Sequence, residues 1–226
     1  MAHANRRQIL RTLGAAGATL GLGCRTKQPA PASPAVRLDA PDASPASEAD
    51  AALVATPSCD DTEHSILGPY WRDGAPMRSN LEDPLTMKGT RFALSGRVRA
   101  AGCKLVLAGA TLDFWQADAE GAYDDGIWPP PKTLFRLRGR VVTDAEGRYT
   151  LATIIPGHYL NGAQYRPAHL HVIAQASGYA KLTTQLYFDG DPYNGIDPFI
   201  KTSLIMKLAN QPTGKSGTFD FVLAPS

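Results

Sequence analysis

The 226-residue chain lacks several features that would assign it at once to a common class of protein. It has no uninterrupted apolar run of about 18 residues, so the sequence does not predict a transmembrane helix. It has no G-x-S-x-G nucleophile motif and no glycine-rich phosphate-binding loop. Its three cysteines, Cys24, Cys59 and Cys103, are too widely spaced for a structural zinc cluster.

A strong excess of charge of either sign is also missing. The chain has 23 Lys+Arg and 21 Asp+Glu, a formal charge of +2. Residues 1–28 contain five of the basic residues and no acidic one, so the remainder has 18 basic and 21 acidic residues, or −3. A nucleic-acid-binding domain normally carries a basic surface on its folded part. We therefore expect no nucleic-acid partner.

Glycine and proline are abundant, with 21 and 18 residues, and they separate short apolar segments. Such spacing favours β structure over helix. We predict an all-β fold, a β-sandwich of mixed and antiparallel strands with long active-site loops, as one domain over residues 59–226. The expected strands cover residues 91–98, 111–116, 134–143, 148–154, 168–175, 181–188, 203–208 and 218–223.

The N-terminal 58 residues have a different character. Arg6 and Arg7 precede a short Gly/Ala-rich apolar stretch that ends at Cys24, which resembles a twin-arginine export signal over residues 1–24. A frayed amphipathic helix is the alternative. Residues 25–58 are rich in Ala, Pro and Ser and are expected to form a disordered linker.

Export leaves three locations open. Cys24 resembles the modified cysteine of a bacterial lipoprotein, but Gly21 stands where that motif usually has Leu. The protein is therefore expected to be periplasmic, secreted or lipid-anchored to the cell envelope. In an oxidising compartment Cys59 and Cys103 are expected to pair as a disulfide, with two buried reduced thiols as the alternative.

His169-Leu170-His171 is the most distinctive local pattern. In a strand, residues i and i+2 point to one face, so the two imidazoles project in parallel and can share a metal ion. Two histidines on a solvated face are the alternative. The opposite face would carry Ala168, Leu170 and Val172, which suits a core.

Several motifs together, in order over residues 66–192, resemble the intradiol ring-cleavage dioxygenases, relatives of catechol 1,2- and protocatechuate 3,4-dioxygenase, and in particular exported members. The motifs are Gly68-Pro69-Tyr70-Trp71-Arg72, Trp115-Gln116-Ala117-Asp118, Gly121-Ala122-Tyr123, Leu137-Arg138-Gly139-Arg140, Pro156-Gly157-His158-Tyr159, Arg166-Pro167-Ala168-His169-Leu170-His171 and Thr183-Thr184-Gln185.

The resemblance implies one non-haem Fe(III) per chain, with Tyr123, Tyr159, His169 and His171 as ligands. A tyrosine phenol has a pKa near 10, so two phenolates at neutral pH call for a hard, highly charged cation such as Fe(III). Two D-A-E-G turns are each followed by a tyrosine, Tyr123 and Tyr149, and turn chemistry does not distinguish them. By the resemblance, Tyr149 is a packing residue.

The implied activity is the insertion of O2 into the bond between the two hydroxylated carbons of an ortho-diphenol, which gives a muconate-type diacid. Tyr159 would leave the metal and act as a base, Arg166 would stabilise negative charge on the ring, and Gln185 would orient the substrate or a neighbouring side chain. A surface salt bridge for Arg166 and a plain strand-face amide for Gln185 are the alternatives. The sequence does not identify the diphenol or the oligomeric state.

A second interpretation comes from another class of protein. Ser95-Gly96-Arg97-Val98 and the segments 143–149 and 156–159 also resemble transthyretin-like or carboxypeptidase-regulatory-like modules, which are non-catalytic β-sandwiches. Those modules lack the H-x-H and T-T-Q motifs. The two interpretations therefore differ in whether the four ligand side chains meet.

Overall fold

A computed structural model describes residues 59–82, 88–124 and 129–226 of the chain. These residues lie in one compact unit, Leu53–Ser226. The export signal and linker predicted for residues 1–24 and 25–58 lie outside the described residues, as does Cys24. In the described part, no helix is long and apolar enough to cross a membrane.

The first of two main sheets is built around the longest strand. Strand β1 (Arg91–Ala100) pairs antiparallel with β4 (Arg148–Ile154) along one edge. Along its other edge it pairs parallel with β11 (Gly214–Thr218) and then with β12 (Phe221–Leu223). Strand β10 (Ala209–Gln211) continues the sheet beyond β11. The sheet is therefore mixed, as the sequence predicts.

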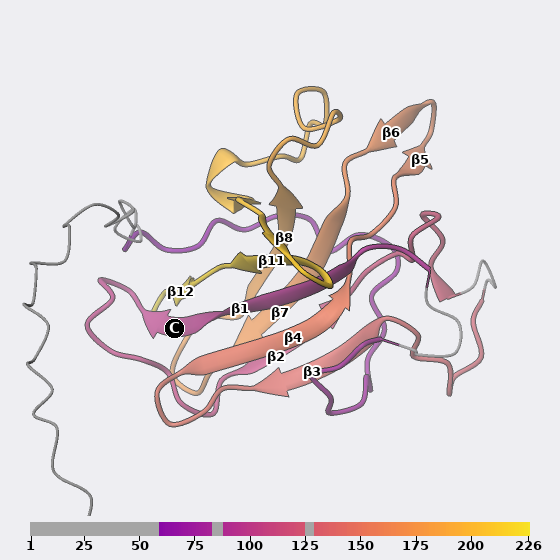
Figure 1. Cartoon of the computed structure of the whole chain (residues 1–226). Coiled ribbons are helices and arrows are strands. Elements are labelled where there is room, and N and C mark those ends of the chain that lie inside the picture. The colour runs from indigo at the N-terminus through magenta and orange to yellow at the C-terminus, as the bar shows by residue number, and fades with distance from the viewer. Residues whose placement is uncertain (1–58, 83–87, 125–128) are drawn as a thin grey trace, which may run out of the picture. The chain divides into compact units, whose positions relative to one another are not determined.

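The second sheet carries the residues of functional interest. Its order is β3-β2-β7-β8-β9, and the first four strands run antiparallel to their neighbours. The strands are β3 (Arg138–Val142), β2 (Thr111–Trp115), β7 (His169–Gln175), β8 (Leu182–Phe188) and β9 (Ile205–Met206). A separate hairpin of β5 (Tyr159–Asn161) and β6 (Gln164–Arg166) projects beyond the sandwich (Figure 1).

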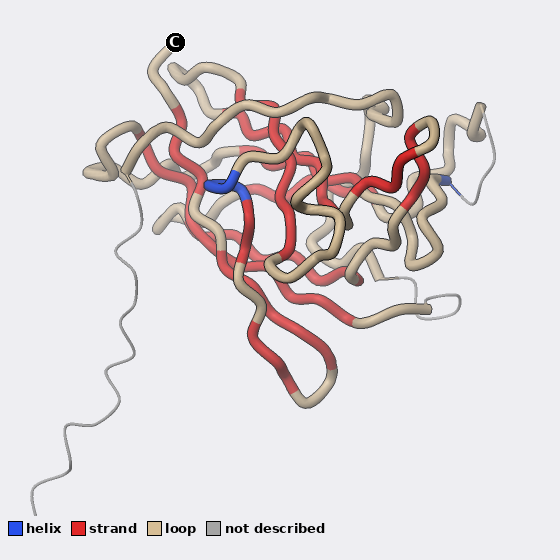
Figure 2. Tube along the Cα trace, turned by 90° about the horizontal axis from the view of Figure 1, so that it is seen from above, coloured by secondary structure: helices blue, strands red, loops and turns tan. Residues whose placement is uncertain are grey.

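The hydrophobic core lies between the two sheets, which Figure 1 shows as stacked layers. Every second residue of the strands points into this core. Phe92 and Leu94 of β1 and Leu112 and Phe114 of β2 are each no more than 1% exposed. The regular secondary structure of the described residues in Figure 2 is almost all strand, joined by long loops, with short helical turns such as η2 (Thr202–Leu204). The predicted all-β sandwich is confirmed.

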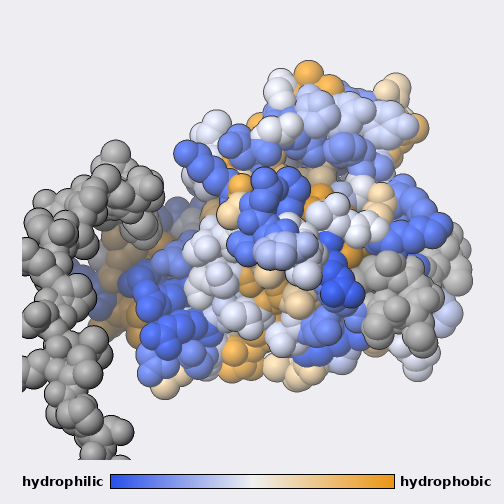
Figure 3. All heavy atoms as spheres, viewed as in Figure 1, coloured by the Kyte–Doolittle hydropathy of each residue, from blue (hydrophilic) through white to orange (hydrophobic). Residues whose placement is uncertain are grey.

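Strand β7 is buried on both faces, which the alternation pattern does not predict. Leu170, Val172 and Ala174 face the main core, each fully buried. On the other face His169, His171 and Ile173 are also buried, because loops cover this side of the sheet. The solvated-face alternative for the two histidines is therefore wrong. In the view of Figure 3, hydrophilic residues and smaller hydrophobic patches alternate over the surface of the domain.

Several strand predictions need correction. The segment 203–208 is a strand only at Ile205–Met206, because Thr202–Leu204 form a helical turn. The segment 218–223 is interrupted between the end of β11 at Thr218 and the start of β12 at Phe221, and β10 and most of β11 were not predicted.

The segment 134–143 is a strand only from Arg138, because Leu137 has φ +49, a left-handed conformation that interrupts an extended chain. The β5–β6 hairpin was not predicted. Its signal is Asn161-Gly162, a common tight-turn dipeptide, and Gly162 has φ +67.

The second D-A-E-G turn shows what Tyr149 does. The Asp144 Oδ1 atom accepts the backbone N–H groups of Glu146 and Arg148 at 3.0 and 2.7 Å, which closes the turn before β4. The buried Tyr149 ring lies over Gly96 of the neighbouring strand β1, and its hydroxyl donates to the Phe219 carbonyl at 2.8 Å. Tyr149 is therefore a packing residue with a satisfied hydroxyl.

The expected disulfide between Cys59 and Cys103 is not formed in the structure. Cys59 and Cys103 are two thiols in the structure, but they are neighbours. A hydrogen bond with Cys59 is the main reason that the pKa of the Cys103 thiol is raised. The two sulfur atoms are thus close enough to meet, although 44 positions separate them in the sequence.

We predict that oxidation joins these thiols. Protein refolded or isolated under oxidising conditions should be lighter by two hydrogen atoms than the same protein after reduction, as measured by intact mass. Peptide mapping should place the bond between Cys59 and Cys103. The variant Cys103→Ser is the control and should show no such difference. Equal masses of the oxidised and reduced wild-type protein would contradict the prediction.

Candidate active site

Four side chains from three parts of the chain meet beside the second sheet. His169 and His171 come from one face of β7, as the i, i+2 spacing predicts. Tyr159 is the first residue of β5. Tyr123 follows the first D-A-E-G turn, in the loop after β2, where Asp118 Oδ1 accepts the N–H groups of Glu120 and Ala122 at 2.9 Å.

The four rings form a closed circuit. The ring centroids are 4.8 Å apart for His169 and His171, and 6.4 Å apart for His171 and Tyr123. The circuit closes through Tyr123 and Tyr159 at 5.7 Å, and through Tyr159 and His169 at 5.6 Å. Two imidazoles and two phenols therefore surround one common centre, which the proposed ligand set requires.

Several polar atoms of this cluster are buried without a hydrogen-bond partner among the described residues. They are the Tyr123 hydroxyl, His169 Nε2 and both ring nitrogens of His171. Buried polar atoms without a partner are rare in proteins because each loses its hydration. His169 Nδ1 lies 2.7 Å from the Pro167 carbonyl, so Nδ1 carries the proton and the Nε2 lone pair faces the centre. Such an arrangement fits a metal ion.

Burial sets the protonation of these groups when no cation is present. It raises the pKa of Tyr123 well above its usual value, and the neighbouring Tyr159 adds to this. Burial also raises the pKa of Tyr159, although Arg166 opposes the shift. The same desolvation lowers the pKa of His169 to about 4 and that of His171 well below its usual value. Both imidazoles are therefore neutral, as metal ligands must be.

The donor set selects the kind of metal. Within residues 59–82, 88–124 and 129–226, no three His, Cys, Asp or Glu side chains converge, so the tyrosines must complete any site. A buried phenol ionises only beside a strong positive charge. Two phenolates and two neutral imidazoles match a hard trivalent cation such as Fe(III), whereas zinc prefers His, Cys or carboxylate.

A buried ion pair fixes Tyr123, and sequence reasoning missed it. Asp124 has φ +51, unusual for a residue with a side chain. Its carboxylate accepts from Arg138 Nε at 3.0 Å and from Nη2 at 2.6 Å, and Arg138 is 1% exposed. Arg138 Nη1 also donates to the Tyr70 carbonyl at 2.7 Å, and the Tyr70 ring stacks on Tyr123 at 4.1 Å. One arginine thus holds both members of the stacked pair.

His171 is confined from two sides. The Trp115 indole stacks on its ring at a centroid distance of 4.8 Å. Gly68, with φ +71, lies against the ring edge, and a Cβ atom at this position would be 3.0 Å from His171 Cε1. A larger residue at the glycine of the G-P-Y-W-R motif would therefore strain the backbone and crowd the His171 ring.

The residues predicted to act on the substrate also lie here. Arg166 is 4% exposed, so the surface alternative is wrong. It donates from Nη2 to the Gln185 Oε1 atom at 2.9 Å and is a hydrogen-bond partner of Tyr159. Gln185 is fully buried and donates to the Ile66 carbonyl at 2.8 Å. Gln185 therefore positions Arg166 in this structure.

Sequence reasoning missed the carboxylate that pairs with Arg166. Asp197 Oδ2 accepts from Arg166 Nε at 2.7 Å, and the Phe199 ring covers the guanidinium at 5.0 Å. Both residues lie in the loop after β8, in a Gly/Asp/Pro-rich region that predicts only a turn.

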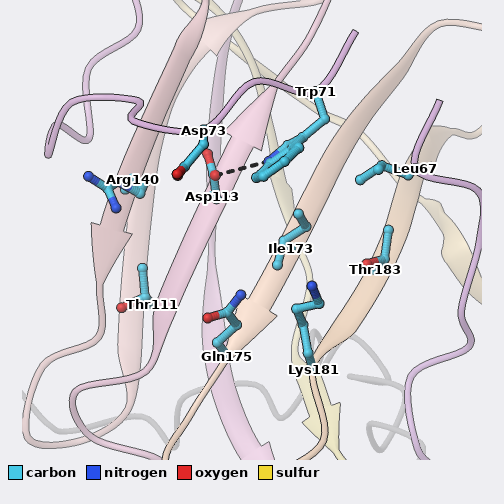
Figure 4. Close-up of a pocket in the computed structure, with 10 residues that line it drawn as sticks. All are labelled: Leu67, Trp71, Asp73, Thr111, Asp113, Arg140, Ile173, Gln175, Lys181 and Thr183. Carbon is cyan, nitrogen blue, oxygen red and sulfur yellow. Dashed lines mark hydrogen bonds between the residues drawn. The ribbon is translucent and has the colours of Figure 1, made fainter. Parts of the chain in front are cut away.

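A polar groove of about 310 Å³ lies farther along the same face of the sheet (Figure 4). The Trp71 indole lies at one end and donates to Asp113 Oδ2 at 3.3 Å. Ile173 and Gln175 of β7 continue the face that carries the histidines. None of the four ring residues lines this groove, so it is separate from the candidate metal centre.

Comparisons with known proteins agree with this geometry. The dioxygenase family model matches residues 66–225. Chlorocatechol 1,2-dioxygenase of Rhodococcus opacus is 32% identical over 166 residues, 64% of each chain. Hydroxyquinol 1,2-dioxygenase of a Rhizobium species is 34% identical over 164 residues, 64% of this chain and 54% of the relative. The chain thus spans less than two thirds of the length of these curated relatives.

A solved structure covers the domain more completely. The dioxygenase domain of a dioxygenase–carbohydrate-binding protein fusion from Streptomyces sp. SirexAA-E is 41% identical, with a TM-score of 0.65. The similarity covers 74% of this chain and 100% of that one. On the family match, the relatives and the shared fold, the chain belongs to the intradiol ring-cleavage dioxygenase family.

Proposed function

We propose that this domain is an Fe(III)-dependent intradiol dioxygenase that cleaves an ortho-diphenol with O2 to a muconate-type dicarboxylate. The observation that carries the proposal is the closed circuit of Tyr123, Tyr159, His169 and His171, with neighbouring ring centroids 4.8–6.4 Å apart and buried ring atoms that lack partners among the described residues. Relatives named for chlorocatechol and hydroxyquinol support a catechol-type substrate.

The iron, when bound, binds the diphenol and makes its ring reactive towards O2. The side chains of the cluster have different roles in holding the metal ion. His169 and His171 offer neutral nitrogen atoms, which burial keeps unprotonated. Tyr123 is 7% exposed and is held by the Asp124–Arg138 pair, so it is suited to remain a ligand.

Tyr159 is suited to exchange with the substrate. It is only partly buried, and Arg166 favours its ionised form. Its phenolate oxygen can therefore accept a proton from a substrate hydroxyl as the substrate binds. The Arg166 guanidinium lies beside this position and can then stabilise negative charge that develops on the ring.

A non-catalytic β-sandwich module is the alternative function. It would need no convergence of phenols and imidazoles, and the observed cluster makes it the weaker candidate. Visible absorption distinguishes the two proposals, since a tyrosinate–iron(III) centre is coloured and a plain module is colourless.

We propose in addition that the mature enzyme acts outside the cytoplasm. Arg6, Arg7 and the Gly/Ala-rich stretch before Cys24 support this, with lipid attachment at Cys24 as one form of it. Cell fractionation of a producing strain should find the wild-type protein in the envelope or the medium. The variant Arg6→Lys/Arg7→Lys should remain in the cytoplasm; equal export of both proteins would contradict a twin-arginine signal.

The first site prediction concerns iron binding. Tyr123→Phe should lose most of its iron and its visible absorption band, because a phenyl ring offers no donor atom. Tyr149→Phe is the matched control, since its hydroxyl bonds only a carbonyl remote from the site. It should retain both. Iron content by elemental analysis and absorption of the reconstituted proteins give the measurement. Full iron and colour in Tyr123→Phe would overturn the ligand assignment.

The second site prediction concerns turnover. Arg166→Gln should still bind iron and catechol but lower kcat by about 10²-fold, the usual effect of removing one donor that stabilises transition-state charge. Arg148→Gln, at an exposed position on β4, should leave kcat unchanged. Oxygen uptake with a panel of ortho-diphenols measures both. Turnover of Arg166→Gln equal to that of the control would remove Arg166 from the chemistry.

A further inference from the structure

The loop between β8 and η2, residues 189–201, reaches back over the candidate site at several points. Gln164 of the β5–β6 hairpin donates from Nε2 to the Ile196 carbonyl at 2.6 Å. Two aspartates of this loop, Asp191 and Asp197, have side chains that are 6% and 1% exposed. Buried carboxylates need partners, and the partners of these two differ.

Asp191 connects two segments that carry ligands. Its Oδ2 atom lies 2.8 Å from His158 Nε2 and accepts the Ala168 N–H at 3.0 Å. His158 immediately precedes Tyr159, and Ala168 immediately precedes His169. Oδ1 accepts the Tyr193 N–H at 3.0 Å, which anchors the carboxylate to its own loop. One carboxylate oxygen therefore contacts both the residue before Tyr159 and the residue before His169, the two proposed ligands.

Asp197 holds a different element. Its Oδ2 atom accepts from Arg166 Nε at 2.7 Å, and its Oδ1 atom accepts the Phe199 N–H at 2.8 Å. The Phe199 ring lies over the guanidinium at 5.0 Å. Carboxylate and ring together fix the direction of Arg166. Among the hydrogen bonds of the described residues, none joins Asp191 to Arg166 or Asp197 to His158.

We propose that the 189–201 loop is a two-point brace, in which Asp191 positions Tyr159 and His169 and Asp197 positions Arg166. Both are positioning residues, and their effects should be separable: Asp191 governs how well iron is held, and Asp197 governs turnover by the iron that is held. The predicted effects on iron binding and turnover rest on the proposed function, whereas the contacts of Asp191 and Asp197 are present in the structure without iron.

The matched variants are Asp191→Asn, Asp197→Asn and Asp189→Asn. Each replaces a carboxylate with an amide of nearly the same shape, and Asp189 is an exposed control in the same loop. For each full-length protein we would measure the iron dissociation constant, kcat per bound iron and KM for catechol. Amide hydrogen exchange at Ala168 in the metal-free protein gives a readout that needs no iron.

Loss of a group that orients metal ligands typically weakens metal affinity or activity by about 10–100-fold. Asp191→Asn should raise the iron dissociation constant by this factor and speed exchange at Ala168. Asp197→Asn should lower kcat per iron by a similar factor, with the iron dissociation constant and KM close to wild type. Asp189→Asn should match wild type in every measurement.

Two results would overturn the brace. One is equal loss of iron in Asp191→Asn and Asp197→Asn, which is the behaviour of a loop with a merely structural role. The other is agreement of both variants with Asp189→Asn. If an Asn variant does not fold, Asp191→Glu or Asp197→Glu takes its place, since each keeps the charge and displaces the oxygens. Wild-type protein without iron would contradict the proposed function instead, and exchange at Ala168 would still test the Asp191 contact.

Discussion

The site depends on one constraint, the burial of phenol and imidazole groups whose polar atoms have no hydrogen-bond partner in the part of the chain that the structure describes. A buried polar atom without a partner costs about 1–3 kcal/mol, and the Tyr123–His169–His171 cluster contains several. Such a cluster persists only where the surrounding fold enforces it or where a bound ion compensates it. The fold supplies the first condition, because strand β7 presents both histidines. The donor set is of the kind that a hard cation, the proposed ion, would compensate.

Two buried ion pairs lie next to the cluster. Arg138 and Asp124 hold the Tyr123 segment, while Arg166 and Asp197 stand beside Tyr159. A buried ion pair contributes little net stability, since desolvation offsets the attraction, but breaking it leaves an uncompensated charge. The pairs therefore act mainly by allowing few alternative arrangements.

The two D-A-E-G turns show how sequence and structure divide the information. They have the same local chemistry, and each is followed by a tyrosine, so the turn predicts neither role. Resemblance to a family selected Tyr123. The structure supplies the physical distinction: the Tyr149 hydroxyl donates to a backbone carbonyl, and the buried Tyr123 hydroxyl has no partner among the described residues.

The sequence by itself determined the all-β class, most strand positions and the shared face of His169 and His171, because these follow from local alternation and turn residues. It also contained the motifs that name the family. Only the tertiary structure decided that both faces of β7 are buried, and that Asp124, Asp191 and Asp197 contact Arg138, Ala168 and Arg166 around the candidate site. Those facts depend on partners far away in the chain, and in a loop sequence an aspartate that will meet a buried arginine looks the same as one that will face water.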